Sequence, residues 1–310
     1  MRERIVFMGT ASFSLAVLKM LIEEDYNIVG VVTQPDRYVG RKKVLTMPDV
    51  KVEALKYDIP VIQPARIKED YQAIVDLKPD LIITAAYGQI VPQAVLDIPC
   101  LGWINVHASL LPLYRGGAPV HQAIIDGQEK TGVTIMYMVK KMDAGDMIAQ
   151  KETPILEEDT VGILYDRLSD LGAELLKETL PDILKGTNQR IPQDENLVAY
   201  APTLSREDER LDWNMSARQV YNKVRGTNPW PGAFTSYKSE IMKIYKAYKG
   251  NTNTVGKPGE IIGIKNKKIE VCCGNSSSIL IDEIQFKGGK RMNVSSYLNG
   301  HSIDIGEILN

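Results

Sequence analysis

The chain has 310 residues, of which 44% are hydrophobic and 25% charged, and these proportions are ordinary for a globular protein. They exclude a disordered, collagen-like or low-complexity chain. No apolar stretch approaches the ~20 residues of a membrane-spanning helix, and the first residues lack the apolar core of a signal peptide. The three cysteines form no disulfide framework, so we expect a cytoplasmic protein with reduced thiols.

Strands and helices alternate through the first part of the chain. Short runs rich in β-branched residues predict strands at residues 4–8, 28–33, 81–84, 102–106 and 133–138. Apolar residues at helical spacing predict helices at residues 13–21, 48–57, 68–78 and 118–126. Near-continuous apolar strands separated by helices are typical of a sheet covered on both faces. We therefore expect a doubly wound, mostly parallel α/β domain of Rossmann-like type.

The sequence pattern changes at about residue 207, after a last long helix and a linker. A long helix is expected to start at Asp159 or Thr160, either of which is a good N-cap, and to end near Gly186. The next residues have little periodicity and indicate a linker over the surface. A helix at 214–225 then precedes β-rich segments at residues 233–238, 241–248, 259–264, 268–273 and 278–285. These short segments predict a small OB-like β-barrel.

The expected boundaries are a first domain at 1–189, a linker at 190–206 and a second domain at 207–310. Charge is uneven between the parts, because residues 207–310 carry 15 Lys and Arg against 11 Asp and Glu, whereas residues 1–206 carry 22 against 28. A basic second domain indicates a polyanion such as nucleic acid as its partner. Six lysines there are candidates for an RNA surface: Lys243, Lys246, Lys249, Lys265, Lys267 and Lys268.

The turn after the first strand argues against a dinucleotide. It contains a single glycine, Gly9, whereas a pyrophosphate-binding turn needs several glycines so that backbone N–H groups approach the phosphates. A nicotinamide-dependent oxidoreductase is therefore disfavoured.

The segment with the clearest chemistry begins at the end of the strand at 102–106. Asn105 and His107 are two residues apart, so their side chains project to the same side. Ligands of open α/β sheets bind at the carboxyl ends of the strands. We therefore expect an amide donor and a titratable imidazole to lie together at the ligand site.

An acidic partner for His107 is expected from the loop after the strand at 133–138. Both loops leave the same sheet edge if the two strands are parallel neighbours. An aspartate there would orient the imidazole and favour its protonated form. Spacing alone leaves Asp143 and Asp146 as alternatives, and either side chain is also common in turns.

These residues resemble the 10-formyltetrahydrofolate-dependent formyltransferases. The resemblance is carried by Asn105-x-His107, by the loop from Ser109 to Gly116, and by Asp143-x-Gly145-Asp146. It implies that the catalytic residues are Asn105, His107 and Asp143, and that no metal is needed. It also implies folate-binding residues, with 10-formyltetrahydrofolate as the formyl donor: Ser109, Leu110, Leu111, Pro112, Tyr87, Gly88 and Ile90.

Other segments resemble the branch of this family that formylates methionyl-initiator tRNA. They include residues 7–10, 33–37, 228–233 and 287–292, whereas glycinamide ribonucleotide formyltransferases resemble the first domain only. The basic loop at 34–48 departs from the family pattern by one residue and a missing proline. The resemblance implies that this loop holds the tRNA acceptor end, through Arg37, Arg41, Lys42 and Lys43.

The expected function is formyl transfer to the α-amino group of methionine on initiator tRNA, with no obligate protein partner. One alternative is a folate-dependent formyltransferase that acts on a nucleotide-sugar amine, because it would share the same three catalytic residues. A second alternative is a non-catalytic RNA-binding protein on a degenerate enzyme fold. The presence of Asn105, His107 and Asp143 argues against the second alternative.

Overall fold

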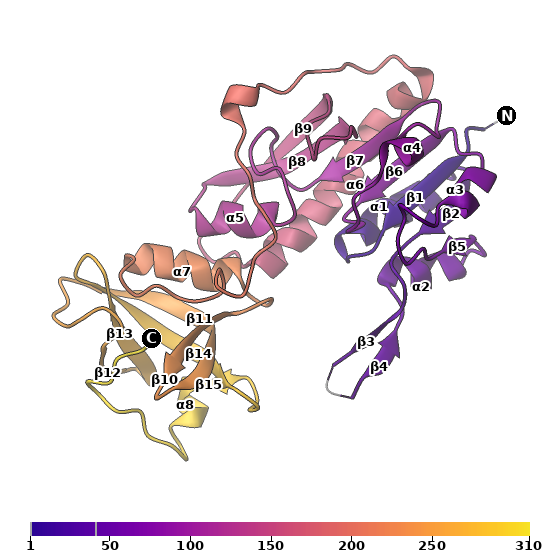
Figure 1. Cartoon of the computed structure of the whole chain (residues 1–310). Helices are drawn as coiled ribbons and strands as arrows, with labels where there is room; N and C mark the ends of the chain where they lie inside the picture. The colour runs from indigo at the N-terminus through magenta and orange to yellow at the C-terminus, as the bar shows by residue number, and fades with distance from the viewer. Residues whose placement is uncertain (1, 41) are drawn as a thin grey trace. The chain divides into compact units, whose positions relative to one another are not determined.

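A computed structural model describes residues 2–40 and 42–310. The chain divides into two compact units (Figure 1). The first unit contains the residues up to Pro119, together with Lys130–Thr153 and Tyr165–Pro202. The second unit contains Val120–Glu129, Pro154–Leu164 and Thr203–Asn310. None of the described helices is long and apolar enough to cross a lipid bilayer.

A seven-stranded sheet in the order β5-β2-β1-β6-β7-β8-β9 organises the first part of the chain. Its first five strands in this order are parallel, which confirms the predicted α/β class. Its elements up to the long helix are β1 (Ile5–Gly9), α1 (Phe13–Glu23), β2 (Ile28–Val32), β3 (Arg37–Val39), β4 (Val44–Thr46), α2 (Asp49–Leu55), β5 (Val61–Ile62), α3 (Gln72–Asp76), β6 (Leu81–Ala85), α4 (Gln93–Leu96), β7 (Trp103–His107), α5 (Pro119–Ile125), β8 (Lys130–Tyr137), β9 (Met147–Pro154) and α6 (Val161–Lys185).

Burial on both faces explains why the central strands are apolar. The side chains of β1 from Ile5 to Met8 have no exposed surface. Helix α6 packs against β7, because a Cβ placed on Gly172 would lie 2.8 Å from Cγ1 of Val106. Since neighbouring strand residues point to opposite faces, Asn105 and His107 lie on the face away from α6. That face also carries Trp103, whose indole Nε1 donates to the Val95 carbonyl of α4 at 3.1 Å.

The second unit is built on an antiparallel sheet in the order β10-β11-β14-β13-β12, with β15 paired to β14. This sheet confirms the predicted small barrel-like β domain. Its helix α7 begins after a complete capping box between Ser216 and Gln219. The remaining elements are the short 3-10 helix η1 (Glu195–Leu197) of the first unit, α7 (Ala217–Gly226), β10 (Ala233–Tyr237), β11 (Glu240–Thr252), β12 (Ile261–Lys265), β13 (Lys268–Cys273), β14 (Ser277–Phe286), β15 (Met292–Asn293) and α8 (Val294–Tyr297).

Three features differ from the expected elements. The loop at 34–48 contains a β-hairpin, β3–β4, in which Tyr38 pairs with Leu45. Strand β9 was not expected, because its outward side chains leave no continuous apolar run. Strand β8 is antiparallel to β7, so the expectation of two parallel neighbours there is wrong. Alternation of residue types gives the faces of a strand but not its direction.

Candidate active site

Asn105 and His107 lie at the carboxyl end of β7, between β6 and β8. Asn105 pairs with Thr84 on β6 and with Met136 on β8. Its side chain is half-buried, whereas His107 is only 6% exposed. The amide and the imidazole therefore share one face of the sheet, as the sequence predicts.

The two nitrogens of the His107 ring have different surroundings. Nε2 lies 3.1 Å from the carbonyl oxygen of Tyr114. A carbonyl oxygen can only accept a hydrogen bond, so Nε2 carries the hydrogen in this contact. Nδ1 lies 3.9 Å from Oδ1 of Asp143, which is longer than a hydrogen bond. Nδ1 is therefore the ring nitrogen that faces the carboxylate of Asp143.

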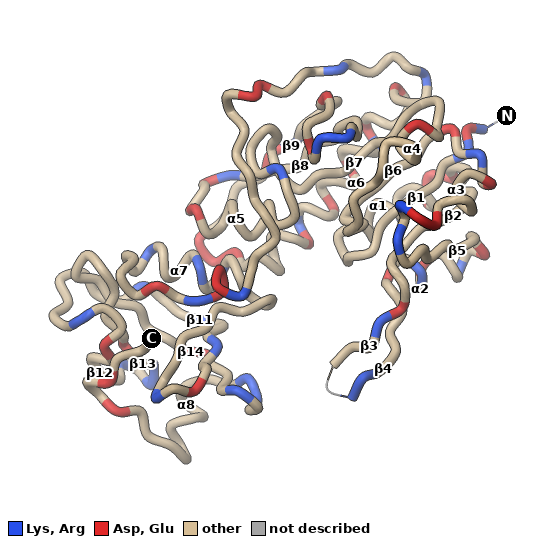
Figure 2. The backbone as a smooth tube through the Cα atoms, viewed as in Figure 1, with Lys and Arg blue, Asp and Glu red and all other residues tan. Residues whose placement is uncertain are grey.

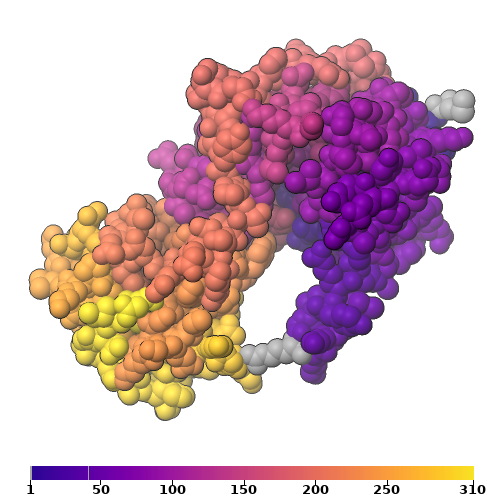
Figure 3. Space-filling view, viewed as in Figure 1, coloured from indigo at the N-terminus to yellow at the C-terminus, as the bar shows by residue number. Residues whose placement is uncertain are grey.

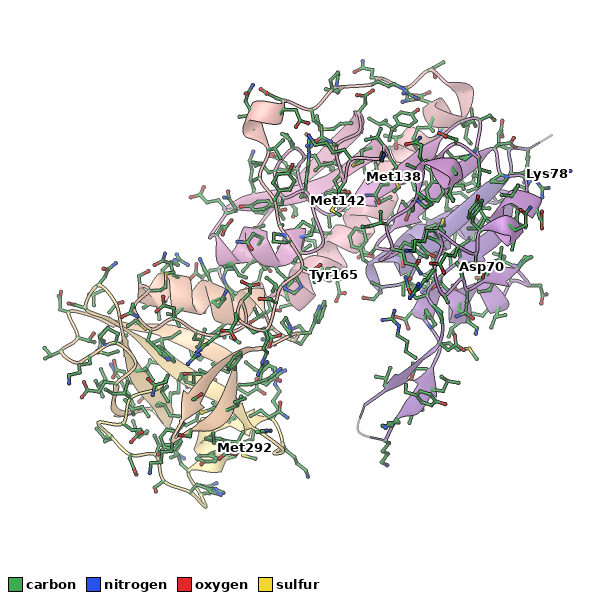
Figure 4. The ribbon with its side chains drawn as sticks, in the orientation of Figure 1. Asp70, Lys78, Met138, Met142, Tyr165 and Met292 are labelled. Carbon is green, nitrogen blue, oxygen red and sulfur yellow. The ribbon has the colours of Figure 1, made fainter. Side chains whose placement is uncertain are left out.

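Asp143 reaches this site from a loop that returns toward the end of β7. Because β8 is antiparallel, its last residue Tyr137 lies opposite Ile104 and not opposite His107. The loop after β8, along which Met138 and Met142 are labelled in Figure 4, brings Asp143 back. Of the two aspartates that spacing left open, Asp143 is the one whose carboxylate faces the imidazole.

Two contacts define the conformation of this loop. Oδ2 of Asp143 accepts a hydrogen bond from the backbone N–H of Gly116 at 2.8 Å. Gly145 lies so close to β8 that an added Cβ would be 1.8 Å from the carbonyl oxygen of Tyr137. The loop therefore needs glycine at residue 145 and a nearby amide for the carboxylate of Asp143.

The candidate folate loop, Ser109 to Pro112, is fixed by the buried side chain of Thr134 on β8 and by the side chain of Gln150 on β9. Thr134 Oγ1 donates to the Ser109 carbonyl at 2.7 Å and accepts from the Leu111 N–H at 3.1 Å. Gln150 donates to the Leu111 carbonyl at 2.8 Å and to Thr134 Oγ1 at 2.9 Å. The peptide bond between Leu111 and Pro112 is cis. Leu110 is half-buried, and Ser109 and Leu111 are buried.

The second candidate folate segment follows β6, the parallel neighbour of β7. Tyr87 is 4% exposed and packs in an apolar cluster with Val91, Val95 and Trp103. Its buried hydroxyl has no hydrogen-bond partner among the described residues. Burial raises the pKa of Tyr87 to about 12, so the hydroxyl stays protonated at neutral pH. Gly88 has a φ of 87°, and Ile90 is 77% exposed.

The hairpin β3–β4 stands out from the first unit (Figure 3) and carries basic residues (Figure 2). Its base is fixed, since Lys51 Nζ lies 2.8 Å from Oδ2 of Asp36 and Arg37 donates to Gln34 at 3.2 Å. Lys42 and Lys43 are exposed near its tip. Arg41 lies outside the described residues. The exposed apolar side chains of the hairpin are Tyr38, Val39, Val44 and Leu45.

Several lysines of the second unit already have partners. Lys249 forms an ion pair with Glu157 at 2.7 Å, and Lys268 forms one with Asp282 at 3.4 Å. Their charges are therefore partly compensated. Within residues 2–40 and 42–310, no group of three His, Cys, Asp or Glu side chains is arranged to hold a metal ion.

Sequence reasoning missed the residues that hold the site loops in place. Thr134 and Gln150 belong to this group, as do Arg115 and Gln193. Thr134 gave a weak signal, because a hydroxyl inside the apolar run at 133–138 needs a hydrogen-bond partner when buried. Gln193 gave none, because its contacts join segments about fifty residues apart.

Comparison with known proteins agrees with this geometry. Residues 3–180 match the formyl transferase family, and residues 203–302 match the formyl transferase C-terminal domain. The chain is 52% identical over 299 residues to the methionyl-tRNA formyltransferase of Staphylococcus aureus strain MW2, with 96% of each chain covered.

Solved structures share the fold at lower identity. An N-formyltransferase from Helicobacter canadensis, in complex with folinic acid and dTDP-3-aminofucose, superposes with a TM-score of 0.69 at 18% identity and covers 93% of this chain and 100% of that one. HypX from Aquifex aeolicus with tetrahydrofolic acid gives a TM-score of 0.66 at 21% identity, over 99% of this chain and 51% of that one. The chain belongs to the methionyl-tRNA formyltransferase family.

Proposed function

We propose that the protein transfers a formyl group from 10-formyltetrahydrofolate to the α-amino group of methionine on initiator tRNA. The product is N-formylmethionyl-tRNA, which serves translation initiation. The observation that carries the proposal is the convergence of Asn105, His107 and Asp143 at the end of β7 in a chain 52% identical to a methionyl-tRNA formyltransferase. A cytoplasmic location belongs to this proposal, because charged initiator tRNA is used there.

The folate is held by the two loops that follow β6 and β7. The buried Tyr87 hydroxyl has no hydrogen-bond partner in the part of the chain that the structure describes, and a polar edge of the folate would satisfy it. The loop from Ser109 to Pro112 is already fixed by Thr134, so little conformational entropy is lost when the ligand binds. When bound, the folate supplies the formyl group.

Asn105 stabilises the negative charge that develops on the formyl oxygen. Its half-buried side chain is held on a central strand, which fixes the direction of the amide donor before the reaction starts. A preorganised donor of this kind typically contributes about 10²–10³ in rate.

His107 holds the proton that the departing nitrogen needs. Its Nε2 is occupied by the Tyr114 carbonyl, so we assign the proton transfer to Nδ1. The imidazole is 6% exposed, and this burial separates the transferred proton from bulk water. General acid catalysis contributes about 10²–10⁴ in rate.

Asp143 accepts the proton that the α-amine loses, through one water, and keeps the His107 ring oriented. An α-amine has a pKa of ~8, so an unprotonated nucleophile is present at neutral pH. The carboxylate is held by the Gly116 N–H at 2.8 Å, which leaves Oδ1 on the side of His107. The general acid, His107, and the general base, Asp143, are therefore neighbours in the site.

The tRNA is held by the hairpin β3–β4 and by the second domain. Arg37, Lys42 and Lys43 supply positive charge near the acceptor end, and Arg41 is assigned the same role from its place in the sequence. In this division, residues 1–189 carry out the chemistry, residues 190–206 link the domains and residues 207–310 bind tRNA. Phosphate contacts of this kind weaken steeply with salt.

The acceptor is tested by measuring formyl transfer from labelled 10-formyltetrahydrofolate. Methionyl-initiator tRNA, uncharged tRNA and a nucleotide-sugar amine are the parallel acceptors. We expect formylation of the charged tRNA only. Formylation of the sugar amine alone would leave the catalytic site as described but refute the proposed substrate.

The hairpin is tested by replacing Lys42 and Lys43 with serine. We expect the KM for charged tRNA to rise at least tenfold, with a weaker salt dependence and an unchanged KM for folate. A variant with serine at Lys19 and Lys68 loses the same charge elsewhere and is the control. An unchanged KM for tRNA in the hairpin variant would exclude the hairpin from tRNA binding.

A further inference from the structure

The segment from Ile191 to Ala201 is bonded to two loops of the candidate active site. Ile191 exchanges two backbone hydrogen bonds with Met147, both at 2.8 Å, at the end of the Asp143 loop. On the loop after β7, the N–H of Arg115 donates to the Ala199 carbonyl at 2.9 Å, and the N–H of Ala201 donates to the Arg115 carbonyl at 2.8 Å. The segment thus spans both loops that surround His107.

Gln193, in the middle of this segment, uses every hydrogen-bonding group of its side chain. Its Nε2 donates to the carbonyl oxygens of Asp143 and Gly145, both at 2.8 Å. Its Oε1 accepts from Nε and Nη2 of Arg115, at 3.0 and 2.8 Å. Carbonyl oxygens only accept and a guanidinium only donates, so the amide has one possible orientation. No other side chain of this length supplies two donors and an acceptor in this way.

Arg115 is fully buried and fixes the other end of this contact. Its Nη2 also donates to Oε1 of Glu195 at 2.9 Å, and Glu195 contacts Lys141 as well. Hydrogen bonds from Arg115 and Lys141 hold the pKa of Glu195 below its usual value. The carboxylate therefore stays charged near neutral pH and keeps the guanidinium in place.

The neighbours of Arg115 in sequence touch both members of the catalytic pair. The Tyr114 carbonyl accepts from Nε2 of His107, and the Gly116 N–H donates to Oδ2 of Asp143. Gln193 then connects Arg115 to the main chain of Asp143. These contacts form a closed ring through His107, Arg115, Gln193 and Asp143.

The backbone of Asp143 needs such support. Its φ is 48°, a left-handed conformation that residues other than glycine adopt at a cost. Residues in such conformations persist when the surrounding structure holds them there. The two hydrogen bonds from Gln193 act on the carbonyls of Asp143 and Gly145, on either side of this turn.

We propose that Gln193 and Arg115 are positioning residues that hold the Asp143 carboxylate against His107 during formyl transfer. This inference rests on the proposed catalytic role of Asp143. It assigns a part in the reaction to a segment outside the strands and loops that carry the three catalytic side chains.

Gln193→Glu is the sharpest variant, because it keeps the side-chain length and the contact with Arg115 but removes both donors. A carboxylate at residue 193 would also be repelled by the carbonyl oxygens of Asp143 and Gly145, which now accept hydrogen bonds from Gln193. We expect kcat to fall at least tenfold, with KM for folate and for charged tRNA within twofold of wild type. Gln189→Glu makes the same charge change at an exposed position just before this segment and should leave kcat unchanged. Gln193→Met, which removes donors and acceptor without adding charge, should also lower kcat.

A double-mutant cycle with Asp143→Ala separates positioning from a general structural role. If Gln193 acts through the Asp143 carboxylate, Gln193→Glu should change kcat less than twofold in the Asp143→Ala background. An equal fold-loss in both backgrounds, or a wild-type kcat in both Gln193 variants, would overturn the inference. The proposed function fails separately, if wild-type enzyme transfers no formyl group or if Asp143→Ala alone has wild-type kcat.

Discussion

Replacing Thr134 by valine tests how the candidate folate loop is held. Thr134 has no exposed surface, and valine has nearly the same shape. The substitution removes the hydroxyl that donates to the Ser109 carbonyl and accepts from the Leu111 N–H. Gln150 keeps its contact with the Leu111 carbonyl, so these two backbone groups are the ones left without their partner.

The expected cost follows from the burial of those two groups. Ser109 is 0% exposed and Leu111 is 3% exposed, so water does not replace the hydroxyl. A buried polar group that loses its partner costs about 1–3 kcal/mol, and two such groups give about 2–6 kcal/mol. The loop also loses its fixed conformation, so the KM for the folate should rise about tenfold or more.

Urea unfolding and steady-state kinetics measure both effects. Thr134→Ser is the matched control, because it keeps the hydroxyl and loses one methyl group, at about 0.8 kcal/mol. We expect the valine variant to unfold at clearly lower urea than the serine variant and to have the higher KM for folate. The same unfolding midpoint and the same KM in the two variants would refute the role of the hydroxyl.

Two further substitutions test the Asp143 loop and the second unit. Gly145→Ala places a Cβ against the Tyr137 carbonyl and must move the loop, so we expect kcat to fall about 10²-fold while folate binding is kept; wild-type kcat would contradict this. The pKa of Glu157 is held at about 2, first by Arg218 and then by Lys249, so this carboxylate stabilises the fold above pH ~4.3 and loses that effect as the pH falls toward 2. Because Glu157 is about half exposed, with 48% of its side-chain surface accessible, Glu157→Gln should lower the free energy of unfolding by about 0.5–1 kcal/mol at pH 7. In urea titrations, the difference in unfolding free energy between wild type and Glu157→Gln should be less than half as large at pH 3 as at pH 7. The same difference at both pH values would exclude the ion pairs of Glu157 as its cause.

The strands and the shared face of Asn105 and His107 were predictable because local rules determine them. The apolar run at 102–106 predicts a buried strand, and a period of two places Asn105 and His107 on one face. Capping residues and apolar spacing likewise predict α6 (Val161–Lys185) and α7 (Ala217–Gly226), which the structure confirms. Each of these conclusions needs only neighbouring residues.

The direction of β8 and the contacts of Gln193 were not predictable, since both depend on distant segments. An apolar run has the same pattern in either direction, so the sequence did not indicate that β8 ends opposite Ile104. The choice of Asp143 over Asp146 came from family resemblance and not from spacing. Gln193 lies in a stretch without periodicity, where hydrogen bonds to loops decide the conformation.

The most direct test of the proposed catalytic site is single-turnover formyl transfer by Asn105→Ala. Asn299→Ala, an exposed asparagine of the second unit, is the control. With folate and charged tRNA at saturation, we expect Asn105→Ala to be slower by about 10²–10³, with unchanged folate affinity and unfolding midpoint. A transfer rate within a few-fold of wild type would contradict the assignment of the reaction to the end of β7.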